Sequence, residues 1–424
     1  MKNHLIIENK ICIRKFIPLI LIIFILLTGM GKMMARDDIR GSLVIVGGRL
    51  EDKEIYKKFI TLAEKYRNKK TDEIKIGIMP AGSADPIKSG KAYKKDFISY
   101  GVSEKNIEII PLAVKDDKST DFDESTWKDN GWNREIAERI KDYDAIWFVG
   151  GDQSRYTKVL IDEKGGHSYV LDAIWEIYKK GAVLGGSSAG AAIMSDPMIC
   201  GGTSLGALNF GITCEDTSDK KGDPRVFLTE GLGFFKFGMV DQHFNQRGRL
   251  GRLIVAVCET KNNIAFGIDE NTALVVDNSS KTVQVIGEGG LTIVNLKKAV
   301  KDISKTRMAM NNIIISYIEK GDTYNLNTGE FEIRKTDDLD KEEYEEKSFV
   351  STSIFDNIKD AITVHLSDFK ETKGMAFEMT GDTEGEGFIL KFKKEEDTKI
   401  FCGSKGFAAI NVHMDIVPVK VKVE

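Results

Sequence analysis

The sequence predicts an α/β protein in which helices flank a mostly parallel sheet. Three observations support this: short runs of Val and Ile, longer helical stretches between them, and glycine-rich segments where the runs end. Continuous apolar runs joined by helices are typical of strands buried on both faces of a parallel sheet. The 424 residues, 42% of them hydrophobic, are enough for one main domain with a smaller attachment.

The order of the expected elements supports this fold class. A first strand at 42–48 is followed by a helix over 53–67, and the later strands also end in glycine or polar residues. Ligands of such sheets gather beyond the carboxyl ends of the strands, so we expect the functional residues there. The other strands predicted for this sheet cover 74–82, 145–151, 182–186 and 234–244.

The two ends of the chain differ from this pattern. Residues 1–36 begin with basic residues, continue into an apolar run and turn polar, which predicts a signal peptide or an N-terminal anchor. We therefore expect a secreted or extracytoplasmic protein. Strands after about residue 263 should be antiparallel and close the sheet edge. The sequence thus divides into a leader at 1–36, a main domain at 37–298 and a small C-terminal accessory region at 299–424, which we expect to be dispensable for chemistry.

Charge and composition exclude several functions. The formal net charge of −4 gives no general attraction to nucleic acid or to an anionic membrane. The five cysteines and five histidines show neither CxxC spacing nor clustering, so no metal site is expected.

The segment 183–192, VLGGSSAGAA, carries the strongest catalytic signal. Gly186 to Gly190 fit the pattern G-x-S-x-G, with Ser188 at the corner between a strand and a helix. In a nucleophile elbow, small neighbours allow the strained turn and the following helix dipole stabilises negative charge. An ordinary capped turn explains the same residues without any chemistry.

A serine nucleophile needs a base, and His243 is the candidate. Of the histidines, it alone ends a predicted core strand, which we place at the same sheet edge as Ser188. Three arginines follow within nine positions and suggest carboxylate recognition, although a solvated helix face is the simpler explanation. Asp241 could accept a cationic substrate group or pair with one of these arginines, which are Arg247, Arg249 and Arg252.

A second strand end, VGGDQSRY at 149–156, offers further groups. Backbone amides after its paired glycines, at Gly151 and Asp152, could join the Ala189 amide in an oxyanion hole. Gln153 could hydrogen-bond a ligand. A plain turn with a helix cap is the alternative.

Taken together, GGDQ, GGSSAGAAIM, DQHFNQRGRLGRL and GIDENTAL resemble the cyanophycinase family, serine peptidases related to aspartyl dipeptidase. The resemblance covers about residues 41–295 and implies a fold like that of class I glutamine amidotransferases, with no metal or organic cofactor. It implies Ser188 as nucleophile and His243 as base. The substrate pocket would comprise Gln153, Asp241, Gln242, Arg247, Arg249 and Arg252.

The orienting acid is less clearly marked. We favour Glu270 in GIDEN, which would hold the imidazole tautomer as the third member of a triad. Glu215 and Asp216 are the rival choices, because some relatives have an acid between the serine and the histidine.

The resemblance implies a serine exopeptidase that hydrolyses cyanophycin, an aspartate polymer with arginine branches, to β-Asp-Arg dipeptides through an acyl-enzyme. The leader at 1–36 adds the expectation that this enzyme is exported. An aspartyl dipeptidase-like enzyme for another acidic peptide is the first alternative. A non-catalytic binding protein on the same fold is the second. A homodimer is possible by analogy, and the membrane would be a partner only if the leader is retained.

Overall fold

The computed structural model describes residues 39–422 apart from 216–222, 261, 336, 339–348, 352–353, 357, 367–369, 380–383 and 404–405. The predicted signal peptide or anchor at 1–36 lies outside the described residues. Among the helices that are described, none combines the length and the apolar character needed to cross a membrane.

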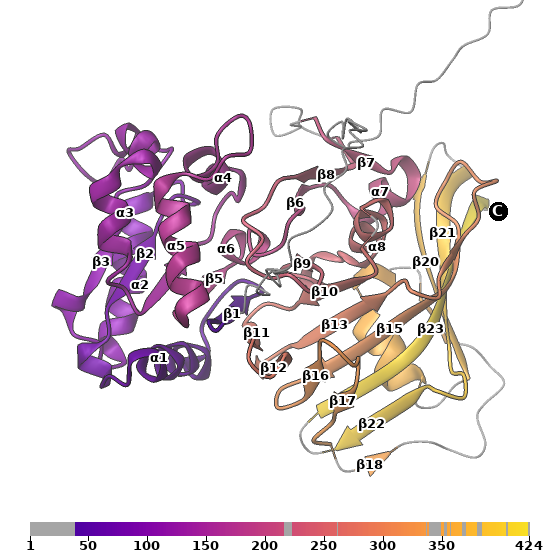
Figure 1. The fold of residues 1–424 in the computed structure, drawn as a ribbon. Coiled ribbons are helices and arrows are strands. Elements are labelled where there is room, and N and C mark those ends of the chain that lie inside the picture. Colours follow the sequence, from indigo (N-terminus) through magenta and orange to yellow (C-terminus); the bar gives the residue numbers. More distant parts are fainter. Residues whose placement is uncertain are drawn as a thin grey trace, which may run out of the picture. The chain divides into compact units, whose positions relative to one another are not determined.

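The first sheet has a parallel core, drawn from indigo to magenta in Figure 1. β1 (Ser42–Val46) pairs in parallel with β5 (Val183–Ser187), and the order continues through β4, β2 and β3. Val46 lies opposite Ser187, so these two strands end side by side, directly before Gly47 and Ser188. The other parallel strands are β4 (Ala145–Phe148), β2 (Ile76–Met79) and β3 (Ile107–Ile109).

Helices cover both faces of this core, which confirms the α/β fold class. α1 (Lys53–Arg67) buries Phe59 against Trp147 on one face, where α2 (Pro86–Ser99) also packs. α5 (Tyr169–Lys180) packs on the opposite face. With α5 lie α3 (Arg134–Ile140), α4 (Ser154–Leu160) and the short α6 (Ala189–Ala192). Short 3₁₀ helices lie between the elements of this part of the chain: η1 (Thr71–Glu73), η2 (Glu104–Asn106) and η3 (Glu124–Trp132).

The other edge of the first sheet is antiparallel, as expected for strands after residue 263. β11 (Thr272–Asp277) pairs with β1, and β12 (Thr282–Gly287) pairs with β11. β16 (Thr323–Asn325) and β17 (Phe331–Glu332) extend this edge.

A second, mainly antiparallel sheet begins with β9 (Met239–Asp241) and β10 (Ile264–Ile268), which pair in parallel. The strand expected at 234–244 is therefore shorter than predicted and lies in this second sheet. The reason is that Phe234 and Phe235 pack as a buried aromatic cluster ahead of the strand. The sheet continues through β13 (Gly290–Asn295), β15 (Met310–Glu319), β23 (Gly406–Lys422), β21 (Glu384–Lys393), β20 (Glu371–Met379) and β19 (Phe349–Ser351).

The predicted accessory region, 299–424, thus shares a sheet with strands from the predicted main domain: β15 pairs with β13 over six positions. Its remaining elements are β14 (Val300–Lys301), β18 (Asp337–Asp338), β22 (Lys399–Gly403), η5 (Ile354–Asp356), α9 (Ile358–Asp360) and η6 (Ala361–His365).

Along the chain, a small third unit comes between β5 of the first sheet and β9 of the second sheet. β6 (Met198–Gly201), β8 (Val226–Thr229) and β7 (Ile212–Thr213) form a sheet of their own. α7 (Ser204–Phe210) packs against α8 (Leu250–Glu259), which follows the second-sheet strand β9. The unit therefore joins the two sheets near the residues discussed below.

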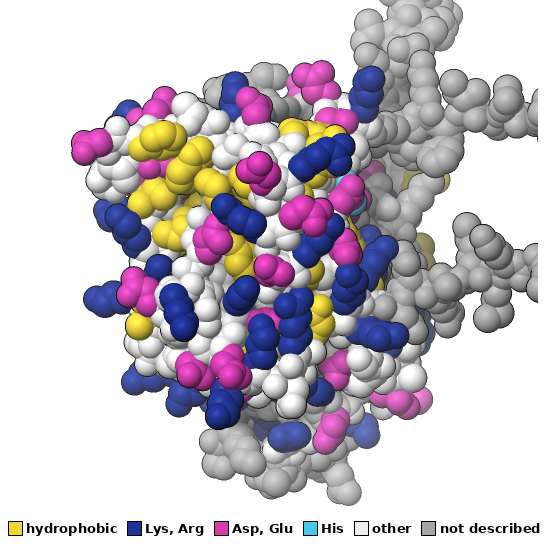
Figure 2. Space-filling view, turned by 60° about the vertical axis from the view of Figure 1, so that its left-hand side comes forward, with side chains coloured by type: hydrophobic (Ala, Val, Ile, Leu, Met, Phe, Trp, Pro, Cys, Tyr) yellow, Lys and Arg dark blue, Asp and Glu magenta, His cyan; other side chains and the backbone are white. Residues whose placement is uncertain are grey.

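Figure 2 shows the face over the α/β part of the molecule, where basic and acidic side chains are interspersed around hydrophobic areas, the largest of them at the upper left. No large region of a single charge sign is seen on this face, which agrees with the small net charge.

A buried ion pair provides a test of the fold. Lys335 and Asp322 are fully buried against each other, and Asp322 also accepts the backbone N–H of Arg334. Lys335→Met should lower the free energy of unfolding by about 3–5 kcal/mol, because it leaves a buried carboxylate without its cation. Denaturant unfolding measures this. The control is Lys320→Met, which breaks a half-exposed pair with Glu54 and should cost under about 1 kcal/mol; equal losses would contradict the assignment.

Candidate active site

Ser188 lies at the sharp corner between β5 and α6. Its φ of 57° and ψ of −110° are strained for a residue with a side chain. The flanking glycines explain the turn: a Cβ on Gly186 would lie 2.6 Å from the Gly190 carbonyl oxygen, and one on Gly190 would lie 2.2 Å from the Phe148 carbonyl oxygen. The G-x-S-x-G pattern is therefore required by close backbone packing at this corner.

His243 reaches Ser188 from the second sheet. It follows β9, has a φ of 47°, and donates its backbone N–H to the carbonyl oxygen of Gly47 over 2.6 Å. That hydrogen bond ties the end of β9 to the end of β1. The prediction that His243 and Ser188 share one sheet edge is wrong, because β9 belongs to the second sheet and the edges of two sheets meet here. Gly48 leaves room for the imidazole, and Gly47 leaves room for the backbone of Ile268 and Asp269.

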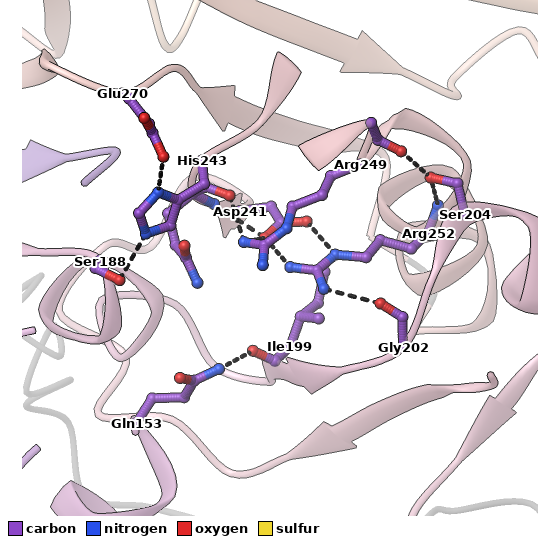
Figure 3. Close-up of polar contacts among 12 residues, drawn as sticks. Gln153, Ser188, Ile199, Gly202, Ser204, Asp241, His243, Arg249, Arg252 and Glu270 are labelled. Carbon is purple, nitrogen blue, oxygen red and sulfur yellow. Dashed lines mark hydrogen bonds and ion pairs between the residues drawn. The ribbon is translucent and has the colours of Figure 1, made fainter. Parts of the chain in front are cut away.

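The three side chains form a continuous hydrogen-bonded line (Figure 3). Ser188 Oγ lies 2.8 Å from His243 Nε2, and His243 Nδ1 lies 2.6 Å from Glu270 Oε1. With the proton on Nδ1 donated to the carboxylate, Nε2 accepts the serine O–H. The line therefore has the polarity that nucleophile activation needs.

Glu270 occupies the position expected for the orienting acid. It follows β10, and its backbone N–H donates to Gln246 Oε1 over 3.0 Å. Both imidazole nitrogens already have partners in Ser188 and Glu270, so this geometry leaves no ring nitrogen for Glu215. Asp216, the other rival, lies outside the described residues.

Burial and charge tune this line. Burial lowers the pKa of His243 below its usual value; the hydrogen bond to Glu270 opposes this shift, and the charges of Arg247 and Arg249 add to it. For Glu270, burial acts to raise the pKa, but the His243 hydrogen bond and the charge of Arg49 outweigh it and lower the pKa. The site therefore favours a neutral imidazole next to an ionised carboxylate.

The predicted oxyanion donors are only partly available. The amide of Ala189 is at the start of α6, where no preceding turn supplies an acceptor. Gly151 has a φ of 135°, and the preceding Gly150 lies next to Ser188, since a Cβ added to Gly150 would be in van der Waals contact with the serine Cβ at 3.4 Å. The Asp152 amide, however, donates to the Gly82 carbonyl over 2.8 Å. The prediction that Asp152 is an oxyanion donor is therefore wrong, because its N–H is already bonded within the fold.

The prediction that Asp241 accepts a cationic group of the substrate also needs correction. Its carboxylate receives both Nε and Nη2 of Arg252, at 2.7 and 2.6 Å, and is only 2% exposed. It also accepts the Gln242 N–H, and it lies 3.4 Å from Arg249 Nη1. The carboxylate pairs with the protein's own arginines, which was the alternative explanation, and does not face a substrate cation.

The three arginines divide into two kinds. Arg252 is 5% exposed and also donates to the Gly202 carbonyl, so it serves the internal network. Arg249 donates to the Gln242 carbonyl, and burial lowers its pKa to about 10. Arg247 is exposed at the end of η4 (Asn245–Arg247), a segment that begins two residues after His243. Arg247 is therefore the cation best placed for a ligand in solution.

Polar groups that lack partners lie near these arginines. The buried Gln242 Oε1 and Asn245 Oδ1 have no hydrogen-bond partner among the described residues. Gln153 donates its Nε2 to the Ile199 carbonyl over 2.7 Å and is 8% exposed (Figure 3). Unpaired buried acceptors are costly, so they indicate a place where a ligand N–H can bind.

Sequence reasoning missed several residues here. Arg49, with a φ of 45°, lies 3.3 Å from Glu270 Oε2. Gly48 lies under the imidazole, and Gln246 and Asn245 anchor the segment after His243. The glycine pair at the end of the first strand was the available signal. Within the described residues, no group of three or more His, Cys, Asp or Glu side chains could hold a metal ion.

Comparisons with known proteins show what the chain is similar to. Residues 128–284 match the family model described as peptidase family S51. The chain is 30% identical to a cyanophycinase of Geminocystis herdmanii, over 68% of this chain and 95% of that protein. It is also 30% identical to a cyanophycinase of Synechococcus elongatus, over 60% of this chain and 70% of that protein. A solved peptidase from an acI-B1 actinobacterium aligns over 68% of this chain and 98% of its own, with 21% identity and a TM-score of 0.46.

The match to the Geminocystis herdmanii protein spans nearly all of that relative and more than two thirds of this chain. The chain therefore belongs to the cyanophycinase family of serine-type peptidases, peptidase family S51.

Proposed function

We propose that this protein hydrolyses cyanophycin to β-Asp-Arg dipeptides through an acyl-enzyme on Ser188. The observation that carries the proposal is the unbroken line from Ser188 Oγ through His243 to Glu270. The relatives named cyanophycinase support the substrate.

The chemistry follows from the line's polarity. Ser188 Oγ attacks the backbone carbonyl carbon while its proton moves to His243 Nε2. The imidazolium then gives that proton to the leaving nitrogen as the C–N bond breaks, which leaves an ester on Ser188. Water repeats the sequence: His243 takes its proton, the ester C–O bond breaks, and Ser188 recovers its hydrogen. Glu270 holds the tautomer throughout.

The tetrahedral intermediate needs donors for its oxygen. The Ala189 amide, at the start of α6, and the Gly151 amide are the groups we assign to it, without Asp152. The N-terminal end of a helix favours the negative charge that develops there.

Recognition of the polymer divides between charge and amide contacts. We assign substrate carboxylates to Arg247 and to Arg249, because a guanidinium pairs with a carboxylate in a planar fork. Substrate N–H groups, including those of the arginine branches, are assigned to the unpartnered Gln242 Oε1 and Asn245 Oδ1. We assign Gln153, which donates to the Ile199 carbonyl, to the same substrate pocket. Asp241 pairs with both Arg252 and Arg249 and so holds Arg249 in place.

The exopeptidase mode, export through the leader and a homodimeric state belong to the same proposal. They rest on the sequence and the family resemblance. A binding protein without catalysis is disfavoured, because it would have no use for a strained Ser188 hydrogen-bonded to His243.

The nucleophile assignment is tested by Ser188→Ala. Release of dipeptides from insoluble cyanophycin, identified by mass, should fall by roughly 10⁶-fold, because serine and histidine act as one unit. The matched control is the neighbouring Ser187→Ala, which should keep activity. Unchanged dipeptide release from folded Ser188→Ala would refute the assignment.

The charge on Arg247 is tested by the pH profile. Arg247 lowers the pKa of His243, so Arg247→Gln should raise that pKa. The base must be neutral to act. When the pH is lowered, the variant should therefore lose activity at a higher pH than the unmodified protein does. The acidic limb of kcat/KM for a small neutral ester should move upwards by some tenths of a unit to about one unit. Arg247→Lys should keep the limb in place; a downward shift in Arg247→Gln would contradict this.

The contact under the imidazole is tested by Gly48→Ala. Gly48 has a φ of 119°, and its added Cβ would lie 2.2 Å from His243 Cε1, so the ring must move. A displacement of about 1 Å can cost roughly 10²-fold in kcat. The control is Gly211→Ala, which has a φ of 74° and no neighbour within 4 Å. Similar kcat values in both variants would show that the contact does not position the ring.

A further inference from the structure

The turn that holds Glu270 lies against the C-terminal sheet. β10 ends at Ile268, which pairs with Leu291 of β13, and Leu291 in turn pairs with Ile318 of β15. Asp269, between Ile268 and Glu270, therefore lies across β13 from the end of β15. Residues well beyond the matched family region, 128–284, thus reach the neighbour of the orienting acid.

A chain of polar contacts, buried from Glu319 to Asp269, crosses this boundary. Lys359 Nζ of α9 lies 2.6 Å from Glu319 Oε1. The Tyr317 hydroxyl lies 3.1 Å from the same Glu319 oxygen and 3.5 Å from Asp269 Oδ2. Tyr317 is fully buried, and Asp269 is only 2% exposed. The Tyr317 hydroxyl is thus held between two carboxylates, one from each part of the chain.

The other end of this chain reaches the residues beside His243. Asp269 Oδ1 accepts the backbone N–H of Asn245, and its Oδ2 accepts Asn245 Nδ2, both over 3.1 Å. Gln246 Oε1 accepts the Glu270 N–H. Two successive side chains of η4 are therefore fastened to the two successive acids at 269 and 270.

Packing leaves this chain little freedom. A Cβ on Gly290 would lie 2.3 Å from the Tyr317 hydroxyl oxygen, and one on Gly289 would lie 2.7 Å from Asp269 Cβ. Asp269 also accepts the Gly290 N–H over 3.1 Å. Lys359 Nζ lies 5.5 Å from the centre of the Tyr317 ring. Because these contacts fix the Tyr317 hydroxyl, a shift of β15 would also shift the carboxylate of Asp269.

We propose that Tyr317 and Asp269 are positioning residues through which the C-terminal sheet aligns His243 with Glu270. The proposal rests on the proposed function of that pair. It departs from the expectation that 299–424 is dispensable for chemistry: without β15, Asp269 would lose the Tyr317 hydroxyl, and Asn245 would be anchored to a less constrained carboxylate.

The test is Tyr317→Phe, which keeps the ring and removes the hydroxyl. The probe is a fluorophosphonate, which labels activated serines without using a peptide pocket. The Oγ–P bond forms, the P–F bond breaks with loss of fluoride, and His243 takes the serine proton. We expect the rate of labelling at Ser188 to fall roughly tenfold, with a denaturation midpoint near that of the unmodified protein.

A spectroscopic readout separates positioning from general stability. The His243 Nδ1 proton, in its 2.6 Å hydrogen bond to Glu270, should give a far-downfield NMR signal. In Tyr317→Phe this signal should move upfield. The matched control is Tyr324→Phe, another buried tyrosine, whose hydroxyl makes no hydrogen bond within the described residues. It should leave both the labelling rate and the signal unchanged.

The outcomes distinguish the two proposals. If the unmodified protein is not labelled at Ser188, the proposed function fails. If it is labelled, and Tyr317→Phe keeps its rate and its downfield signal, the positioning role fails. Should Tyr317→Phe not fold, Lys359→Met decides: its side chain is 39% exposed, so folding should persist, and a labelling rate equal to that of the unmodified protein would overturn the proposal.

Discussion

The site depends on one contact, the 2.8 Å hydrogen bond between Ser188 Oγ and His243 Nε2. Each of these residues has a positive φ, so the backbone is strained on both sides of the contact. Such strain persists only where the surroundings fix the conformation. Here the Gly186 and Gly190 approaches fix the serine, and the hydrogen bond from the His243 amide to Gly47 fixes the histidine.

This contact also explains why two sheets must meet. Ser188 follows a strand of the parallel core, whereas His243 and Glu270 follow β9 and β10 of the second sheet. In the glycine pair after β1, Gly48 leaves space for the imidazole, and Gly47 leaves space for the backbone that follows β10. The catalytic line is therefore a property of the junction, so residues that fix the second sheet, including those of its C-terminal strands, bear on the alignment of the base.

Much of the fold and of the candidate site could be predicted from the sequence, because short local patterns indicate them. The parallel strands and the elbow at Ser188 each depend on a short pattern with a physical cause, whereas the preference for Glu270 in GIDEN over Glu215 and Asp216 depends on the family resemblance. What could not be predicted depends on partners distant in sequence. The saturation of Asp241 by Arg252, the use of the Asp152 amide by Gly82 and the sheet to which β9 belongs are all decided by tertiary pairing. Arg49 gave no signal, since a lone arginine after a strand has many uses.

The most direct measurement of the central claim is to stop the reaction with acid during turnover of cyanophycin and to map the protein by mass. A Ser188 that is activated by His243 should carry an ester-linked acyl group whose terminal residue is an arginine-bearing aspartate, on the peptide that contains residue 188. The same peptide from His243→Ala should carry none. An adduct on a different residue, or turnover with no adduct at Ser188 under conditions that preserve esters, would contradict the account.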